Sequence, residues 1–170
     1  HEAVQRESKA ARDSAGILDA STLGKIDIQG TDASEFLNRV YTNAWSKLEI
    51  GKCRYGLMLN EDGMVYDDGV TTRLDENHYI MTTTTGGAAT VLGKLEDYLQ
   101  TEWPELDVYL TSVTDHYATI SVCGPNSKKI IQKVIPEIDL SDKDFPHMSF
   151  KNSKIGKVKC RIMRISFTGE

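Results

Sequence analysis

Two adjacent acids, Asp67 and Asp68, are the residues of this sequence whose type and spacing best suit chemistry. They lie in a stretch, residues 53–74, that is typical of two β-strands joined by a turn at residues 60–63. Because successive strand residues point to opposite faces of a sheet, the two carboxylates cannot serve the same site. Only one of them can therefore face a given cavity.

The strand alternation predicts that Asp68 shares its face with the more apolar and aromatic residues, Met64, Tyr66 and Val70. Asp67 is predicted to lie on the opposite face with Val65, Gly69 and Thr71. Burial on an apolar face favours the protonated form of a carboxyl group, which suits a general acid or base near neutral pH. The alternative is that Asp68 is a solvated acid at a strand end.

Two tyrosines, Tyr55 and Tyr66, fall on the two strands of this hairpin. They could line a pocket for a flat ring, or they could pack within a half-buried sheet. The segment Thr84-Thr85-Gly86-Gly87, between a strand and a helix, could hold an anion on helix N–H groups, but an ordinary N-cap turn is the favoured explanation. The scattered histidines lack metal-ligand spacing, and neither a Walker loop nor a dinucleotide-binding fingerprint is present.

Composition narrows the class of protein. The 170 residues carry a formal net charge of −5, without a run of Lys or Arg, so we expect no nucleic-acid partner. No apolar stretch approaches the ~20 residues that span a membrane, so we expect no membrane partner. Three widely spaced cysteines favour a reduced, cytoplasmic protein. The chain begins without a methionine and stops without a closing element, so we expect a fragment of a longer polypeptide.

The rest of the chain must position the hairpin. Periodicity predicts helices over residues 1–14, 32–41, 88–100 and 126–134, and Asp32 with Glu35 suggests a capping box for the second. It predicts further strands over residues 23–29, 77–85, 108–113 and 117–122, and a final hairpin over residues 150–166. This order favours an α+β fold with mainly antiparallel sheets and packed helices, in one domain or two small lobes.

Four segments together resemble the folate-binding domain of the glycine-cleavage T-protein (aminomethyltransferase) family. They are GILDASTLGKIDIQGTDASEFLNRVYTN (16–43), RYGLMLNEDGMVYDDG (54–69), CGP (123–125) and RISFTGE (164–170). They lie in family order, so residues 1–170 are identified as the N-terminal portion of such a domain. Within the family, residues 21–25, 41–45, 81–87 and 100–104 resemble the branch formed by the alpha subunits of bacterial heterotetrameric sarcosine oxidases.

The resemblance implies a tetrahydrofolate site. The family's catalytic or folate-orienting aspartate falls on Asp68, and two folate-pocket positions fall on Tyr55 and Glu170. A Glu170 carboxylate would accept N–H bonds from the pterin edge, and Asp67 would be structural. The resemblance also implies FAD, FMN and NAD elsewhere in the assembly, and beta, gamma and delta subunits as partners.

The implied reaction is oxidative demethylation of sarcosine to glycine. The sarcosine-derived imine would then deliver its one-carbon unit to tetrahydrofolate, which gives 5,10-methylenetetrahydrofolate. Two alternatives stay open: a free-standing aminomethyltransferase of the glycine-cleavage system, and a non-catalytic folate-binding module.

Overall fold

The computed structural model describes residues 1–166, and its chain divides into two compact units. Residues 21–117 form one unit, and residues 1–20 together with the chain from Ala118 onward form the other. Each contains helices and antiparallel sheets, so the α+β fold expected from the sequence is confirmed. Within the described residues no helix is long and apolar enough to cross a membrane.

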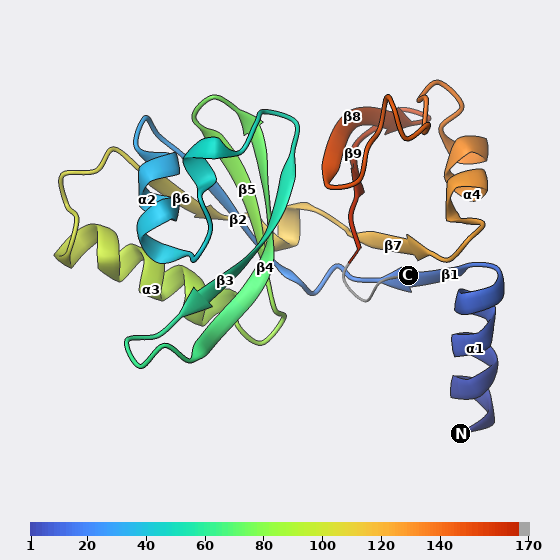
Figure 1. Ribbon diagram of the computed structural model, residues 1–170, viewed down its shortest axis with the longest axis horizontal. Coiled ribbons are helices and arrows are strands. Elements are labelled where there is room, and N and C mark those ends of the chain that lie inside the picture. The colour runs from blue at the N-terminus through green and yellow to red at the C-terminus, as the bar shows by residue number, and fades with distance from the viewer. Residues whose placement is uncertain (167–170) are drawn as a thin grey trace. The chain divides into compact units, whose positions relative to one another are not determined.

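The unit of residues 21–117 is built on a five-stranded antiparallel sheet with the strand order β3-β4-β5-β2-β6 (Figure 1). Its strands are β2 (Gly24–Gln29), β3 (Cys53–Leu59), β4 (Val65–Asp75), β5 (His78–Thr83) and β6 (Tyr109–Ser112). Its helices are α2 (Ala33–Val40), α3 (Ala88–Thr101) and the 3₁₀ turns η1 (Trp45–Lys47) and η2 (Thr114–His116). Figure 1 shows α2 and α3 on the same side of the sheet.

One hydrophobic core joins these helices to that side of the sheet. The alternating strand β2 contributes Ile26 and Ile28, which are buried, as the sequence pattern predicted. Helix α2 contributes Phe36 and Leu37, and Val91 is one of the buried residues of α3. The side chains that alternate with these core residues therefore point to the opposite side of the sheet.

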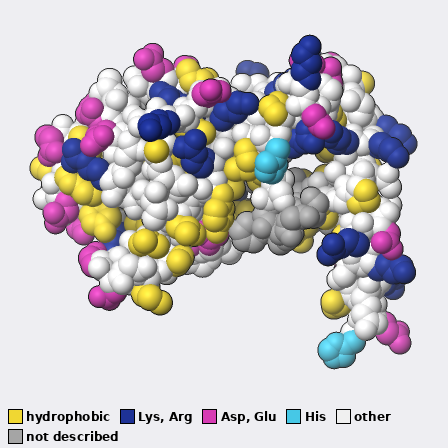
Figure 2. Space-filling model, in the orientation of Figure 1, with side chains coloured by type: hydrophobic (Ala, Val, Ile, Leu, Met, Phe, Trp, Pro, Cys, Tyr) yellow, Lys and Arg dark blue, Asp and Glu magenta, His cyan; other side chains and the backbone are white. Residues whose placement is uncertain are grey.

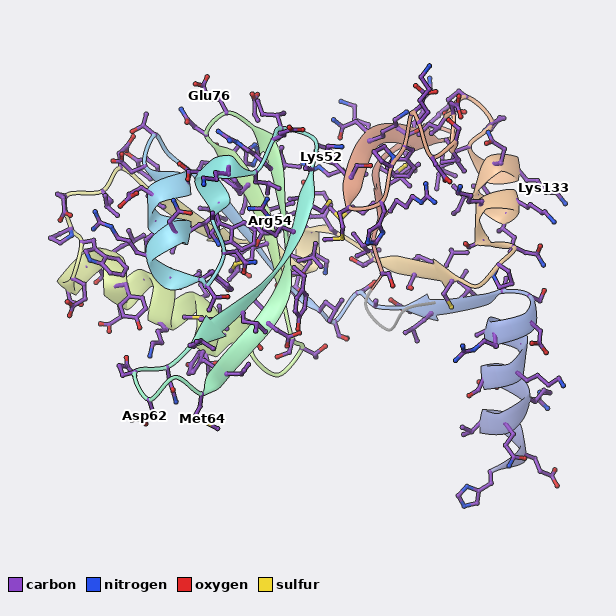
Figure 3. The ribbon with its side chains drawn as sticks, viewed as in Figure 1. Lys52, Arg54, Asp62, Met64, Glu76 and Lys133 are labelled. Atoms are coloured by element: carbon purple, nitrogen blue, oxygen red, sulfur yellow. The ribbon has the colours of Figure 1, made fainter. Side chains whose placement is uncertain are left out.

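The predicted hairpin is present as β3 and β4, with a turn in which Gly63 has a φ of 76°. Figure 3 shows Asp62 and Met64 at the turn of this hairpin and Lys52 near its other end. The register shifts between Met58 and Leu59, which is a β-bulge. The strict alternation assumed from the sequence is therefore interrupted just before the two adjacent acids.

The other unit contains two separate two-stranded ribbons and two helices. The elements are α1 (Glu2–Asp13), β1 (Gly16–Asp19), β7 (Ile120–Cys123), α4 (Ser127–Val134), β8 (Ser149–Ile155) and β9 (Val158–Arg164). β1 pairs with β7 and β8 with β9. A small core of Ile135, Ile138, Leu140 and Phe145 lies under α4 and the β8–β9 ribbon. Lys and Arg side chains gather over the same elements in Figure 2.

The capping box expected at the start of α2 is absent. The Asp32 side chain makes no capping bond to α2, and instead its Oδ2 accepts a hydrogen bond from the backbone N–H of Asp107 at 2.9 Å. Glu35 is an ion-pair partner of Arg39, one turn further along the same helix. The predicted capping box is thus replaced by one link to a distant loop and one helix-surface ion pair.

Candidate functional site

The predicted residues Tyr55 and Asp68 lie on the side of the sheet that faces away from α2 and α3. A Cβ added at Gly56 would lie 2.6 Å from the buried Trp45 ring, so Gly56 points toward the helices. Alternation along β3 then directs Tyr55 to the opposite side, here called the far face of the sheet. Leu57 and Asp68 are directly paired across the strands, so Asp68 lies on the far face as well.

The structure brings these two predicted site residues into direct contact. The Tyr55 hydroxyl donates a hydrogen bond to Asp68 Oδ2 at 2.6 Å. Tyr55 keeps 41 % of its surface exposed, and Asp68 is half-buried. The hydrogen bond to Asp68 is the main reason why the pKa of Tyr55 lies above its ordinary value, with desolvation as a smaller cause. A hydroxyl donor and a carboxylate acceptor are therefore presented together at an accessible place.

The regular pairing of β4 with β5 ends before it reaches Asp68. The pairing of β4 with β5 ends at Thr71 and Met81, so the segment of β4 before Thr71 is paired with β3 alone. At this point the Thr82 hydroxyl takes the place of the ladder: it accepts from the Val70 N–H at 2.9 Å and donates to the Val70 carbonyl at 3.1 Å. The two segments nevertheless stay close together here, since a Cβ added at Gly69 would lie 1.8 Å from the Thr82 carbonyl oxygen.

The sequence argument misjudged which acid is buried. Asp67 is only 5 % exposed, whereas Asp68 is half-buried and Met64 and Val65 are exposed. The reason is that Asp67 lies on the side of the sheet that packs against the helices, while the apolar residues near the turn project into solvent. The bulge also takes Tyr66 off the face on which Asp68 lies. Lys94 of α3 lies over the Tyr66 ring, with its Nζ 5.0 Å from the ring centroid.

Asp67 holds the loop that starts α3. Its Oδ1 accepts from the Thr84 hydroxyl at 2.6 Å, and its Oδ2 accepts from the Thr84 N–H at 3.2 Å. The same Thr84 hydroxyl accepts from the N–H of Gly87, which precedes the first turn of α3. The place where an external anion could have bound is thus taken by the protein's own carboxylate, as expected for an N-terminal turn.

A buried tyrosine lies near both acids. Tyr41 is 6 % exposed and packs edge-on against Trp45, with ring centroids 5.9 Å apart. Burial raises the pKa of Tyr41 well above its ordinary value, and the charges of Asp67 and Asp68 raise it further. Tyr41 therefore keeps its proton near neutral pH.

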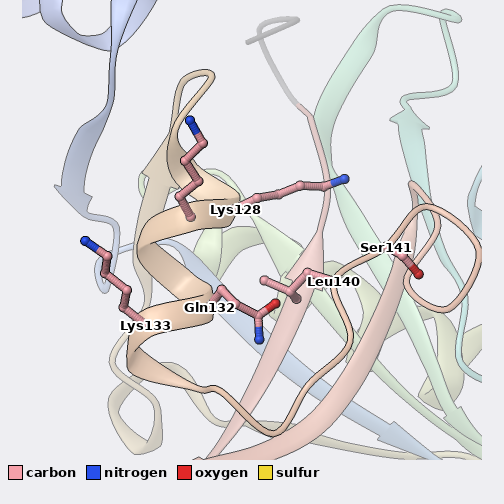
Figure 4. A pocket seen from close by; sticks show the side chains of 6 residues that line it. Lys128, Gln132, Lys133, Leu140 and Ser141 are labelled. Atoms are coloured by element: carbon pink, nitrogen blue, oxygen red, sulfur yellow. The ribbon is translucent and has the colours of Figure 1, made fainter.

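The remaining predictions have different outcomes. Glu170 lies outside the described residues. His78 is bonded to Asp27, with Nε2 and Oδ1 2.7 Å apart, and no group of three His, Cys, Asp or Glu within residues 1–166 could hold a metal ion. All three cysteines are free thiols. A shallow depression on the other unit lies against α4 (Figure 4); it is lined by Lys128, Lys129, Gln132, Lys133, Leu140 and Ser141, none of which was predicted.

Sequence reasoning missed Thr82 and Lys94, and it did not foresee that Thr84 bonds Asp67. Thr82 and Thr84 belong to a run of four threonines at the end of a strand, and such a hydroxyl-rich strand end is the signal that could have marked them. Lys94 contacts Tyr66, Tyr98 at 5.4 Å, and Glu61 at 3.0 Å. The spacing of Lys94 and Tyr98, four residues apart on one helix, was visible in the sequence.

Known proteins resemble the whole chain. It is 57 % identical over 170 residues to the sarcosine oxidase alpha subunit of Corynebacterium sp. (strain U-96), covering 99 % of this chain and 18 % of that subunit. It is 32 % identical to the aminomethyltransferase of Listeria monocytogenes serotype 4a (strain HCC23), covering 98 % of this chain and 44 % of that enzyme. The chain thus spans less than half the length of either relative, and the resemblance expected from the sequence is confirmed.

Solved structures show the same fold. Glycine cleavage system aminomethyltransferase T from Bartonella henselae matches 98 % of this chain and 42 % of its own, with a TM-score of 0.80 and 23 % identity. A chain of heterotetrameric sarcosine oxidase from Corynebacterium sp. U-96, in complex with pyrrole 2-carboxylate, matches 95 % of this chain and 79 % of its own, with a TM-score of 0.62 and 11 % identity. The family described as the GCVT N-terminal domain matches residues 1–170, and this chain belongs to it.

Proposed function

We propose that this chain provides the tetrahydrofolate site of a sarcosine oxidase alpha subunit. The observation that carries the proposal is the hydrogen bond between the partly exposed Tyr55 and Asp68, on the far face of the sheet. The family resemblance implies a folate-binding role for both residues. The 57 % identity to a sarcosine oxidase alpha subunit supports this branch of the family.

The groups present fit a reduced pterin and its reaction. Tetrahydrofolate would supply the nucleophilic nitrogen that takes up the one-carbon unit of the sarcosine-derived imine. Asp68 would accept or position the proton released in that transfer, because its carboxylate is only half-buried and is held by the Tyr55 hydroxyl. Tyr55, with an exposed ring, would contribute to the pocket wall. Glu170 would complete the site by accepting N–H bonds from the pterin edge.

The other parts of the reaction are assigned outside this chain. Sarcosine would be oxidised at a flavin elsewhere in a cytoplasmic hetero-oligomer, where FAD, FMN and NAD would be bound by other domains and subunits. The products would be glycine and 5,10-methylenetetrahydrofolate. Holding the two reactants in one site would contribute several kcal/mol by proximity alone.

A free-standing aminomethyltransferase is the second candidate function. It is favoured by the 32 % identity to the Listeria enzyme and by the fold shared with the Bartonella enzyme. In that case the same Asp68 would serve transfer of an aminomethyl carbon to tetrahydrofolate, without coupled oxidation of sarcosine.

The test uses the full-length protein in its assembly, with Asp68→Asn as the variant and Asp62→Asn as the matched control. Asp62 is an exposed acid at the turn of the same hairpin (Figure 3). Oxygen consumption with sarcosine and formation of 5,10-methylenetetrahydrofolate are measured in parallel. Asp68→Asn is expected to lower methylene transfer by about 100-fold or more and to leave sarcosine oxidation unchanged.

Wild-type rates of both reactions in Asp68→Asn would show that the role assigned to Asp68 is wrong. A protein that transfers an aminomethyl carbon but oxidises no sarcosine would support the second candidate. Tetrahydrofolate binding without either reaction would indicate a non-catalytic folate-binding module.

A further inference from the structure

The contact between Tyr55 and Asp68 has the length of a strong hydrogen bond. The two oxygens are 2.6 Å apart, within the range typical of a hydroxyl that donates to a carboxylate. Tyr55 is paired with Val70, and Asp68 with Leu57, so the two residues are diagonal neighbours on adjacent strands. A long tyrosine side chain bridges such a diagonal readily.

Regular hydrogen bonding fixes the backbone around both residues. The β3–β4 ladder continues through Tyr55, Gly56 and Leu57 without a shift of register. On the other side of β4, the Thr82 hydroxyl bonds both the N–H and the carbonyl of Val70, two residues beyond Asp68. Because strands position a side chain more accurately than loops do, the geometry of the pair is built into the sheet.

Tyr55 supplies the one hydrogen bond that the Asp68 carboxylate makes among the described residues. It engages Oδ2, whereas Oδ1 accepts none from residues 1–166. The same bond keeps the Tyr55 hydroxyl protonated, because it raises the pKa of Tyr55 above its ordinary value of about 10. Tyr55 therefore acts as a donor throughout the physiological pH range, and one carboxylate oxygen is left for a reactant.

We propose that Tyr55 is a positioning residue that acts through Asp68. Its hydroxyl fixes the orientation of the carboxylate by holding Oδ2, so that Oδ1 is directed to the transferred proton. This inference rests on the proposed function, and it assigns to the hydroxyl a role that differs from lining the pocket with the ring. Loss of the hydroxyl should slow transfer and leave the binding of tetrahydrofolate intact.

The test compares Tyr55→Phe with Tyr66→Phe in the full-length protein in its assembly. Tyr66 is a suitable control because its exposure, 39 %, is close to the 41 % of Tyr55, and its hydroxyl bonds no carboxylate among the described residues. Tyr55→Phe is expected to lower the transfer rate at saturating tetrahydrofolate by about tenfold, with the dissociation constant within about twofold of wild type. Tyr66→Phe should change neither quantity, and sarcosine oxidation reports that every variant is assembled.

The double variant Tyr55→Phe/Asp68→Asn separates action through Asp68 from an independent role. If Tyr55 acts through Asp68, the double variant transfers the one-carbon unit as slowly as Asp68→Asn alone. Three results would each overturn the inference. The first is a double variant whose loss of transfer rate is the product of the two single losses. The others are a Tyr55→Phe variant that binds tetrahydrofolate more weakly at an unchanged transfer rate, and one that behaves as wild type in both. The single variant Asp68→Asn tests the proposed function separately. If that variant transfers the one-carbon unit at the wild-type rate, the proposed function itself is wrong, whatever the Tyr55 variants do.

Discussion

Asp67→Asn and Asp68→Asn should have different consequences, one for stability and one for transfer, although the two substitutions are adjacent and chemically identical. Asp67 is 5 % exposed and accepts two hydrogen bonds from Thr84, one of them at 2.6 Å. An asparagine has one acceptor and one donor group in the same place, so it cannot accept both bonds. Asp68 accepts one bond from a half-exposed tyrosine, and water can replace it.

The magnitude follows from the lost contacts. A hydrogen bond to a charged group contributes about 1.5–3 kcal/mol, and a carboxylate at a helix N-terminus adds about 0.3–1 kcal/mol. Because Thr84 is exposed and its N–H can turn to water, we expect Asp67→Asn to destabilise the start of α3 by about 2 kcal/mol. Since 1.4 kcal/mol corresponds to a factor of ten, the local opening equilibrium should rise by about 30-fold.

Amide hydrogen exchange measures this opening locally in a large protein. Peptides that cover Thr84 to Val91 should exchange about 30-fold faster in Asp67→Asn, and within about twofold of wild type in Asp68→Asn. Peptides from α4, in the other unit, serve as an internal reference. Unchanged exchange at the start of α3 in Asp67→Asn, or equal acceleration in both variants, would refute the assignment of Asp67 to structure and of Asp68 to the site.

Two further substitutions test the packing around the hairpin. Gly56→Ala places a Cβ 2.6 Å from the buried Trp45 ring and should destabilise the fold by about 1–3 kcal/mol. Gly93→Ala, on the open surface of α3, should stabilise it by up to about 1 kcal/mol. Unfolding temperatures that shift in the same direction for both variants would contradict this. Because burial raises the pKa of Tyr41, the folded protein keeps a proton that the unfolded chain loses above pH ~10, so stability should fall as pH rises above that value. Tyr41→Phe should reduce this alkaline loss in denaturant titrations, and an unaltered slope would show that another group is responsible.

The fold was largely predictable because its elements carry clear local signals. The stripes of α2 and α3 and the alternation of β2 each place their apolar residues in one core, as the periodicity indicated. The pairing of β1 with β7 was beyond reach, because Ile17 and its partner Val122 are more than a hundred residues apart. No local pattern reports which distant segment completes a ribbon.

The candidate site residues came from the family resemblance, whereas the contact between them was not predicted. The resemblance selected Tyr55 and Asp68, and the hairpin placed them on neighbouring strands. Their hydrogen bond depends on a register that the turn and the bulge fix together, and a sequence does not state that register. Asp67, and not Asp68, is the buried acid because its face of β4 packs against the helices, and the sequence does not state which face of a strand a helix will cover.

The unit that carries Tyr55 and Asp68 is an insertion within the other one. Its two connections leave side by side, since the Ala20 N–H donates to the Thr119 carbonyl at 2.8 Å where β1 meets β7. A ribosome adds about 5–20 residues per second, so β1 waits on the order of 5–20 s for its partner strand to be made. Every strand of the inserted unit's sheet is made before β7. Early folding of this unit would bring the two connections together and so lower the entropy lost when the outer ribbon closes.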